Sequence, residues 1–122
     1  MSYFAYKLLH FVGIFTMVTA LASTAMRGLL GAPASSLHRR VMGAAHGLAA
    51  LAIMLGGFGM LARMGIIQAG LPAWVMMKVA IWFVLVAAIV LPRFGTGYAR
   101  ALLVVLPLLA GAACATALYK PF

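Results

Sequence analysis

The chain has 122 residues, of which 67% are hydrophobic and only 7% charged. A soluble domain carries about 25% charged residues, and a chain this short cannot hide so much apolar surface in one water-facing core. The charged residues are nine Lys and Arg with no Asp or Glu, which excludes side-chain salt bridges, carboxylate general bases and carboxylate metal ligands. The sequence therefore predicts an all-α integral membrane protein.

Four apolar stretches each reach the length of about 20 residues that spans the hydrocarbon core of a bilayer. The first two run over residues 3–26 and 41–61, and the other two over 73–91 and 98–118. The first stretch is longer than the apolar core of a secretory signal, so we expect it to be a retained helix. We expect one domain, residues 1–122, folded as a four-helix membrane bundle.

The connections between these stretches carry turn and capping residues. The first connection, residues 31–36, ends in two serines, either of which can cap the second helix. Pro72 precedes the third helix, where proline suits the first turn. The third connection, residues 92–97, includes Thr96 as a cap for the fourth helix. We expect Pro107 to kink that fourth helix, which membrane helices tolerate.

The positive residues predict the topology, because Lys and Arg in short loops stay cytoplasmic. Those near the first and third connections are Arg27, Arg39, Arg40, Arg93 and Arg100. Fewer lie on the opposite side, at Lys7, Arg63 and Lys120. We therefore expect a multi-pass protein of the bacterial inner (cytoplasmic) membrane with both termini on the outer, periplasmic side. The cations are scattered among apolar helices, which favours anionic lipid headgroups over nucleic acid as partners.

Polar residues within apolar spans are costly, and they indicate candidate functional positions. With this topology, His10 lies about 10 Å below the outer face, and Lys78 lies at a similar depth on the third helix. Gly57 shares this layer, within a run of small residues at 56–59 that lets a flat ligand or another helix approach the backbone. Lys7 is a further candidate contact, although either lysine could instead extend to the membrane surface.

His46 is a second candidate cofactor contact, approached from the inner face. It is expected about 15 Å from His10 along the membrane normal, so the two histidines cannot easily ligate one haem iron. Gly43 and Gly47 form a GxxxG pattern, which is typical of a helix-packing face. His10 could equally hydrogen-bond a neighbouring carbonyl. Cys114, the single cysteine, is expected to be an inert buried thiol.

Three local patterns occur together along the chain. They are Lys7-Leu8-Leu9-His10 in the first span, His46 followed by Leu-rich sequence and Gly56-Gly57 in the second, and Trp74-Val75-Met76-Met77-Lys78 at the start of the third. Over most of its length the chain resembles the SirB-like family of small inner-membrane proteins. More distantly it is similar to the HemJ-type protoporphyrinogen oxidases and the copper-resistance D membrane domain. Both share an early first-helix histidine and a Trp-x-x-x-Lys motif opening the third helix.

The HemJ-type resemblance implies binding of haem b or another tetrapyrrole. It implies that His10 is the functionally important histidine and the metal ligand, and that Lys78 corresponds to the lysine of the third-helix motif. The chain is shorter than members of that family and lacks their aromatic, proline and arginine pattern after the histidine. The resemblance therefore does not extend to oxidase activity.

Two functions fit these observations. The first is a binding or redox module whose outer-leaflet pocket holds haem b, another tetrapyrrole or a quinone. His10 would be its axial ligand or hydrogen-bond partner, and Lys78 would pair with a propionate or a carbonyl. The absence of carboxylate side chains favours an anionic ligand, because the cations of this layer otherwise repel one another. The second function is an accessory subunit of a larger membrane complex, or a homo-oligomer, without chemistry of its own. In neither case do we expect an enzyme by itself.

Overall fold

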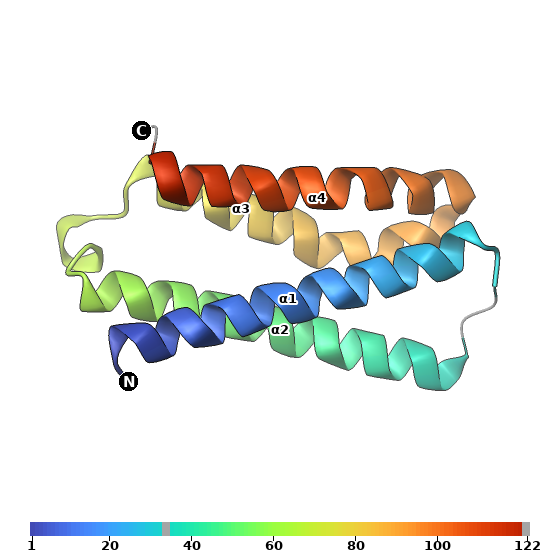
Figure 1. Cartoon of the computed structure of the whole chain (residues 1–122), viewed down its shortest axis with the longest axis horizontal. Helices are drawn as coiled ribbons and strands as arrows, with labels where there is room; N and C mark the ends of the chain where they lie inside the picture. The colour runs from blue at the N-terminus through green and yellow to red at the C-terminus, as the bar shows by residue number, and fades with distance from the viewer. Residues whose placement is uncertain (33–34, 121–122) are drawn as a thin grey trace.

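The computed structural model of the protein describes residues 1–32 and 35–120. Pro33 and Ala34, which belong to the predicted first connection, lie outside the described residues, as do residues 121 and 122. Figure 1 shows long helices running side by side, with the two termini at the same end of the bundle. The described residues contain no β-strand, which confirms the prediction of an all-α chain.

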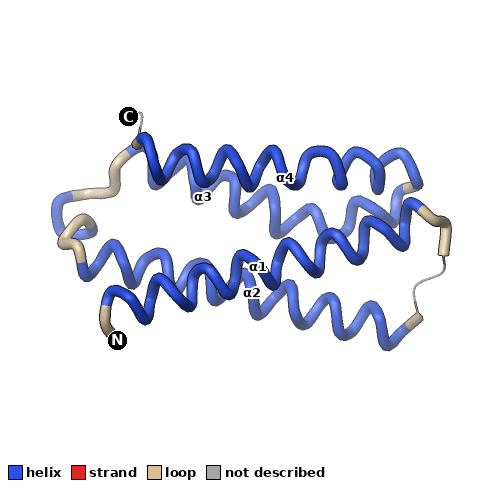
Figure 2. The backbone as a smooth tube through the Cα atoms, viewed as in Figure 1, coloured by secondary structure: helices blue, strands red, loops and turns tan. Residues whose placement is uncertain are grey.

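Four helices in the described ranges are long and apolar enough to cross a membrane. They are α1 (Tyr3–Leu29), α2 (Ser36–Arg63), α3 (Ala73–Ala87) with its 3-10 extension η2 (Ala88–Phe94), and α4 (Thr96–Tyr119). A short 3-10 turn, η1 (Ile67–Ala69), lies between α2 and α3. Figure 2 shows how little of the described chain lies outside helices. The prediction of four apolar helices is confirmed.

The helix starts depend on local capping. Ser35 is the N-cap of α2, and its hydroxyl accepts a hydrogen bond from the His38 amide at 3.0 Å. The predicted serine cap is thus confirmed, and α2 begins at Ser36 rather than at residue 41 because the cap lies upstream of the first apolar residue. The predicted Thr96 cap is wrong, because Thr96 is already the first residue of α4. The residue before it is Gly95, whose φ of 141° favours glycine.

Prolines affect the last two helices differently. α4 continues through Pro107 as one helix, whereas α3 changes to a 3-10 helix at Ala88, upstream of Pro92. Pro92 has no amide hydrogen to bond the Ala88 carbonyl, and a residue before proline avoids the α conformation. The 3-10 helix extends to Phe94, so the connection predicted over residues 92–97 is reduced to Gly95.

The buried core mixes alanines with larger residues such as Met17 and Leu21, whereas many other large apolar side chains are exposed. Small buried residues include Ala20, Ala25, Ala49, Ala88 and Ala99. Large apolar residues that are 61–78% exposed include Phe4, Phe15, Leu55, Phe83 and Leu118. Folding in water would bury these large side chains, since burial of apolar area is its main driving force. Small residues at helix contacts and large apolar residues outside are the arrangement expected of helices that pack in lipid.

Glycines allow α1 and α2 to pack closely. A Cβ atom added at Gly56 would lie 2.7 Å from the Tyr6 carbonyl oxygen and 2.7 Å from the His10 amide nitrogen. A Cβ atom at Gly13 would lie 3.0 Å from the Ala49 carbonyl oxygen. Both contacts involve backbone atoms, which cannot turn aside as a side chain can. The crossing of α1 over α2 therefore depends on these glycines, and it fixes His10 against α2.

Among the described residues, nothing packs against the predicted face at Gly43 and Gly47. A Cβ atom added at either glycine would have no neighbour within 4 Å, and both residues are exposed. The physical reason is that α1 and α2 separate towards the end of the bundle that carries their connection (Figure 1). The close approach of the two helices occurs instead at Gly13 and Gly56.

Candidate functional site

A cavity of about 420 Å³ lies between the four helices, in the half of the bundle that carries the two termini. Its lining residues fall within residues 3–18 of α1, 53–64 in and just after α2, 74–85 of α3, and 110–120 in and just after α4. Most are apolar or aromatic. The volume is within the range of about 300–1,000 Å³ that is usual for small-ligand pockets.

The cavity is bounded on one side by small residues of α4. Ala110, Ala113 and Ala117 all line it, and their spacing places them on one face of the helix. Large residues of the same helix point outwards, with Leu108 67% and Val104 59% exposed. Because α4 turns its alanine face inwards and its larger side chains outwards, a space remains between α4 and the α1–α2 pair.

His10 is the one described histidine that lines the cavity, and it is buried, with 7% of its surface exposed. Its Nδ1 lies 2.8 Å from the Ile53 carbonyl oxygen of α2. Because a carbonyl can only accept, Nδ1 carries the hydrogen and the neutral ring keeps a lone pair on Nε2. The expectation that His10 hydrogen-bonds a carbonyl is confirmed for Nδ1. No described residue hydrogen-bonds Nε2, so this nitrogen is available to a ligand.

The bond from His10 Nδ1 to a backbone carbonyl is also common among histidines that ligate metals. Histidines that ligate metals usually donate their other N–H to a carbonyl or carboxylate, which sets the tautomer and the ring orientation. Gly57 lies beside the same ring, since a Cβ atom there would be 3.4 Å from His10 Cε1 and Nδ1. The position of His10 is therefore suited both to ligating a metal and to accepting a hydrogen bond.

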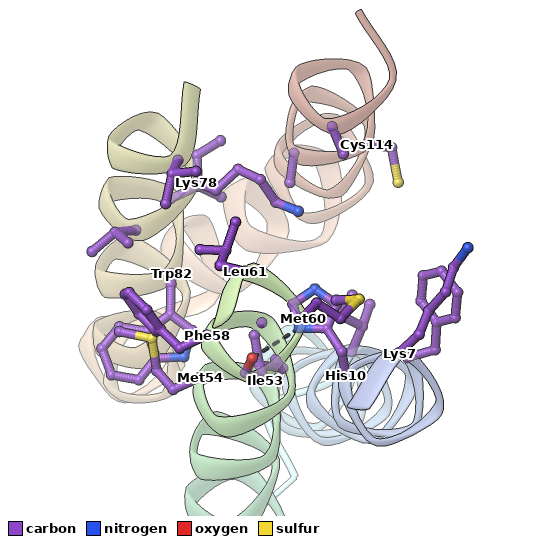
Figure 3. Close-up of a pocket in the computed structure, with 18 of the residues that line it drawn as sticks. Lys7, His10, Ile53, Met54, Phe58, Met60, Leu61, Lys78, Trp82 and Cys114 are labelled. Atoms are coloured by element: carbon purple, nitrogen blue, oxygen red, sulfur yellow. Dashed lines mark hydrogen bonds between the residues drawn. The ribbon is translucent and has the colours of Figure 1, made fainter. Parts of the chain in front are cut away.

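Lys78 reaches the cavity from α3. Figure 3 shows its side chain extending from α3 into the space between the helices. Its ammonium group forms no hydrogen bond or ion pair with any residue that the structure describes, and the chain has no Asp or Glu that could balance it. The structure thus brings together three residues that the sequence placed in one layer, namely His10, Gly57 and Lys78.

Two further lysines line the cavity and lie against its aromatic residues. Lys7 Nζ is 5.9 Å from the centre of the Tyr3 ring and 6.0 Å from that of Phe11. Lys120 Nζ is 5.3 Å from the centre of the Trp74 ring. Such distances allow attraction between a cation and the face of a ring. Lys7 was a predicted contact, whereas Lys120 was assigned only to the outer surface.

The structure does not bring His46 to this cavity. His46 lies seven residues before Ile53 on α2, which corresponds to about 10 Å along the helix axis. Its Nε2 is 3.0 Å from the Val86 carbonyl oxygen of α3, so the side chain joins α2 to α3. Trp82 makes a second link between these helices, because its Nε1 donates to the Ala50 carbonyl oxygen at 3.1 Å.

The Trp82 link gives a first testable prediction. Replacing Trp82 with phenylalanine keeps an aromatic ring but removes the donor, so we expect the free energy of unfolding to fall by about 1 kcal/mol, as for interhelical hydrogen bonds in membranes. Denaturation followed by far-UV circular dichroism measures the change. Met76→Leu, at an exposed position of the same helix, is the control and is expected to leave stability unchanged. An equal loss in both variants would show that the Trp82 link contributes nothing.

The donor set of the cavity limits what metal chemistry it can support. Among the described residues there is no group of three or more His, Cys, Asp or Glu side chains that could hold a metal ion. A metal held inside a macrocycle needs fewer protein ligands, and His10 Nε2 could supply one. Met60 lines the same cavity and could offer its thioether sulfur as a second ligand. Cys114 also lines the cavity and is exposed, so the prediction that its thiol is buried is wrong.

Comparison of the chain with protein-family models, with curated proteins and with solved structures gives no match. The resemblance to the SirB-like and HemJ-type families therefore stays a prediction.

Proposed function

We propose that the protein binds a planar, membrane-soluble redox cofactor, haem b or a quinone, in the cavity beside His10. Its place is a bacterial inner membrane, with both termini on the periplasmic side. The five arginines at the end of the bundle opposite the termini support this orientation, since positive loops stay cytoplasmic. The cavity then lies in the outer leaflet.

One observation carries the proposal. A histidine whose Nδ1 is bonded to a backbone carbonyl and whose Nε2 has no partner among the described residues lines the same largely apolar cavity as Lys78, which likewise has no described partner. Few polar groups in an apolar pocket are what orients a small ligand. For haem b, His10 would supply an axial nitrogen and Lys78 would pair with a propionate. For a quinone, Lys78 would donate to a ring carbonyl, and His10 would accept a hydrogen bond from the hydroxyl of the reduced form.

The test is to purify the protein from its native membrane in mild detergent and identify what remains bound. A Soret band in the absorption spectrum identifies haem b, and mass spectrometry of an organic extract identifies a quinone. We expect one of the two, in roughly equal molar amount to the protein. Absence of both from freshly purified protein would overturn the proposal.

The second candidate function is an accessory subunit of a larger membrane complex or a homo-oligomer. The observation that favours it is the exposed face of α2 at Gly43 and Gly47, where no described residue lies within 4 Å of an added Cβ atom. Glycines spaced in this way allow close approach of a helix from another chain. Size-exclusion chromatography in mild detergent tests it, since this function requires elution as a complex, and elution as a monomer would exclude it.

A further inference from the structure

We propose that the cavity selects ligands that carry an anionic group, a carboxylate or a phosphate, held by Lys7, Lys78 and Lys120. The inference rests on the proposed function and narrows it. Among planar cofactors it favours one with acidic side groups, such as a haem with its propionates, over a neutral quinone. It also makes the cavity a site for other anionic amphiphiles of suitable size.

The cavity carries an uncompensated positive charge. Its lining includes three lysines contributed by α1, α3 and the segment just after α4, and the chain has no Asp or Glu. No side chain of this protein can therefore neutralise them. Cations that are withdrawn from water are costly unless they are paired. Lys7 and Lys78 are half-buried, whereas Lys120 is exposed, so an anion supplied by a ligand would remove this cost at Lys7 and Lys78.

Two of the three ammonium groups lie against aromatic rings, and none of the three hydrogen-bonds a described residue. Lys7 and Lys120 lie against aromatic rings of the cavity wall, at 5.9 Å from the Tyr3 ring and 5.3 Å from the Trp74 ring. Contact with a ring face attracts the charge but uses none of the three N–H donors of an ammonium group. Neither ammonium group hydrogen-bonds a described residue, and the same holds for Lys78. The donors of all three lysines are thus available to the oxygen atoms of an anion.

The lysines differ in polarity from most of the cavity wall. Apart from the lysines, His10, Tyr3 and Cys114, the lining consists mostly of apolar and aromatic side chains such as Met17, Ile53 and Leu85. Such a wall suits the apolar body of a ligand, while Lys7 lies in the second turn of α1, Lys78 in the second turn of α3 and Lys120 just after α4. A molecule with an acidic head group and an apolar body matches these cationic and apolar parts of the lining better than a neutral molecule does.

The cavity contains its own optical reporter. The chain has two tryptophans, and both Trp74 and Trp82 line the cavity. All tryptophan fluorescence of the protein therefore originates at the cavity wall. A contact quencher that enters the cavity would reduce the emission in a saturable way, whereas one dissolved in the bilayer would quench in proportion to its concentration.

The experiment uses the full chain in nanodiscs of phosphatidylcholine, titrated with a fatty acid brominated in its chain or with the methyl ester of the same acid. The two probes share the apolar chain and differ only in the charge. We expect saturable quenching by the acid at a concentration at least about tenfold below that needed for the ester, the effect of about one charged hydrogen bond. Equal quenching curves for acid and ester would overturn the inference.

Variants assign the effect to the lysines. Lys78→Gln and Lys120→Gln should each reduce the preference for the acid, while Lys120→Arg keeps the charge and should retain it. Arg39→Gln, at the opposite end of the bundle, is the control and should leave the preference unchanged. A preference that survives in the Lys78→Gln, Lys120→Gln double variant would contradict the role of these residues.

A competition experiment identifies whether the site binds a lipid phosphate as well as a carboxylate. Unbrominated phosphatidic acid relieves the quenching by the brominated fatty acid if the lysines bind a lipid phosphate, and it leaves the quenching unchanged if the site is specific for carboxylates. Either result supports anion selection. The proposed function fails separately, because it depends on finding haem or quinone in the purified protein and not on these titrations.

Discussion

Gly56→Leu is expected to lower the free energy of unfolding by about 3 kcal/mol, at the upper end of the usual range for overpacked interiors. A Cβ atom at this position would lie 2.7 Å from the Tyr6 carbonyl oxygen and from the His10 amide nitrogen. Since both are backbone atoms of a neighbouring helix, α1 has to move away from α2 to make room. Denaturant unfolding in detergent, followed by circular dichroism, measures the loss.

The control for this change is Gly43→Leu on the same helix. Gly43 is exposed, and no described residue lies within 4 Å of a Cβ atom added there, so the added side chain would point into lipid. We expect its stability to remain within about 0.5 kcal/mol of the unaltered protein, as for other surface changes. Similar losses at the two positions would mean that α1 and α2 do not cross at Gly56.

His10→Phe is expected to weaken cofactor binding by at least about tenfold, since it removes a buried polar contact to the ligand while keeping a planar ring. The same change removes the bond to the Ile53 carbonyl oxygen, which is expected to lower stability by about 1 kcal/mol. The amount of bound haem or quinone per protein molecule, measured on purified protein, gives the first effect, and denaturation gives the second.

His46→Phe separates the two effects. His46 also donates to a backbone carbonyl oxygen on a neighbouring helix, that of Val86, but it does not line the cavity. This variant should retain its cofactor even if its stability changes. Loss of cofactor in both variants to the same extent would show that the histidines act only through the fold, and it would remove His10 from the binding site.

The number of helices and their approximate positions could be predicted, because they follow from the apolar composition of each stretch. Uninterrupted apolar stretches of membrane-spanning length gave four helices, and counting residues from one end placed His10 and Lys78 in the same layer. Both now line the cavity. Capping could be predicted where a serine precedes the helix, as at Ser35, but not where a glycine with positive φ performs the turn, as at Gly95.

The rotation of each helix about its axis could not be predicted, and most errors come from this. In a soluble helix the apolar face reveals which side is buried, whereas all sides of these helices are apolar. Nothing in the local sequence therefore showed that Gly43 and Gly47 face outwards or that Cys114 lines the cavity. The Ala110, Ala113 and Ala117 spacing on α4 was the available signal, because small residues mark contacts or spaces inside a membrane bundle.

The central claim is that the space enclosed by His10, Lys78 and the small face of α4 holds a ligand. Native mass spectrometry of Ala113→Phe and Ala112→Phe tests it directly, because these adjacent changes add the same side chain to different faces of α4. Ala113 lines the cavity, whereas Ala112 is exposed and does not.

We predict a single ligand adduct on the unaltered protein and on Ala112→Phe, and its loss from Ala113→Phe, in which the new ring occupies the cavity. Retention of the same adduct by Ala113→Phe, or the absence of any adduct from the unaltered protein, would contradict the account.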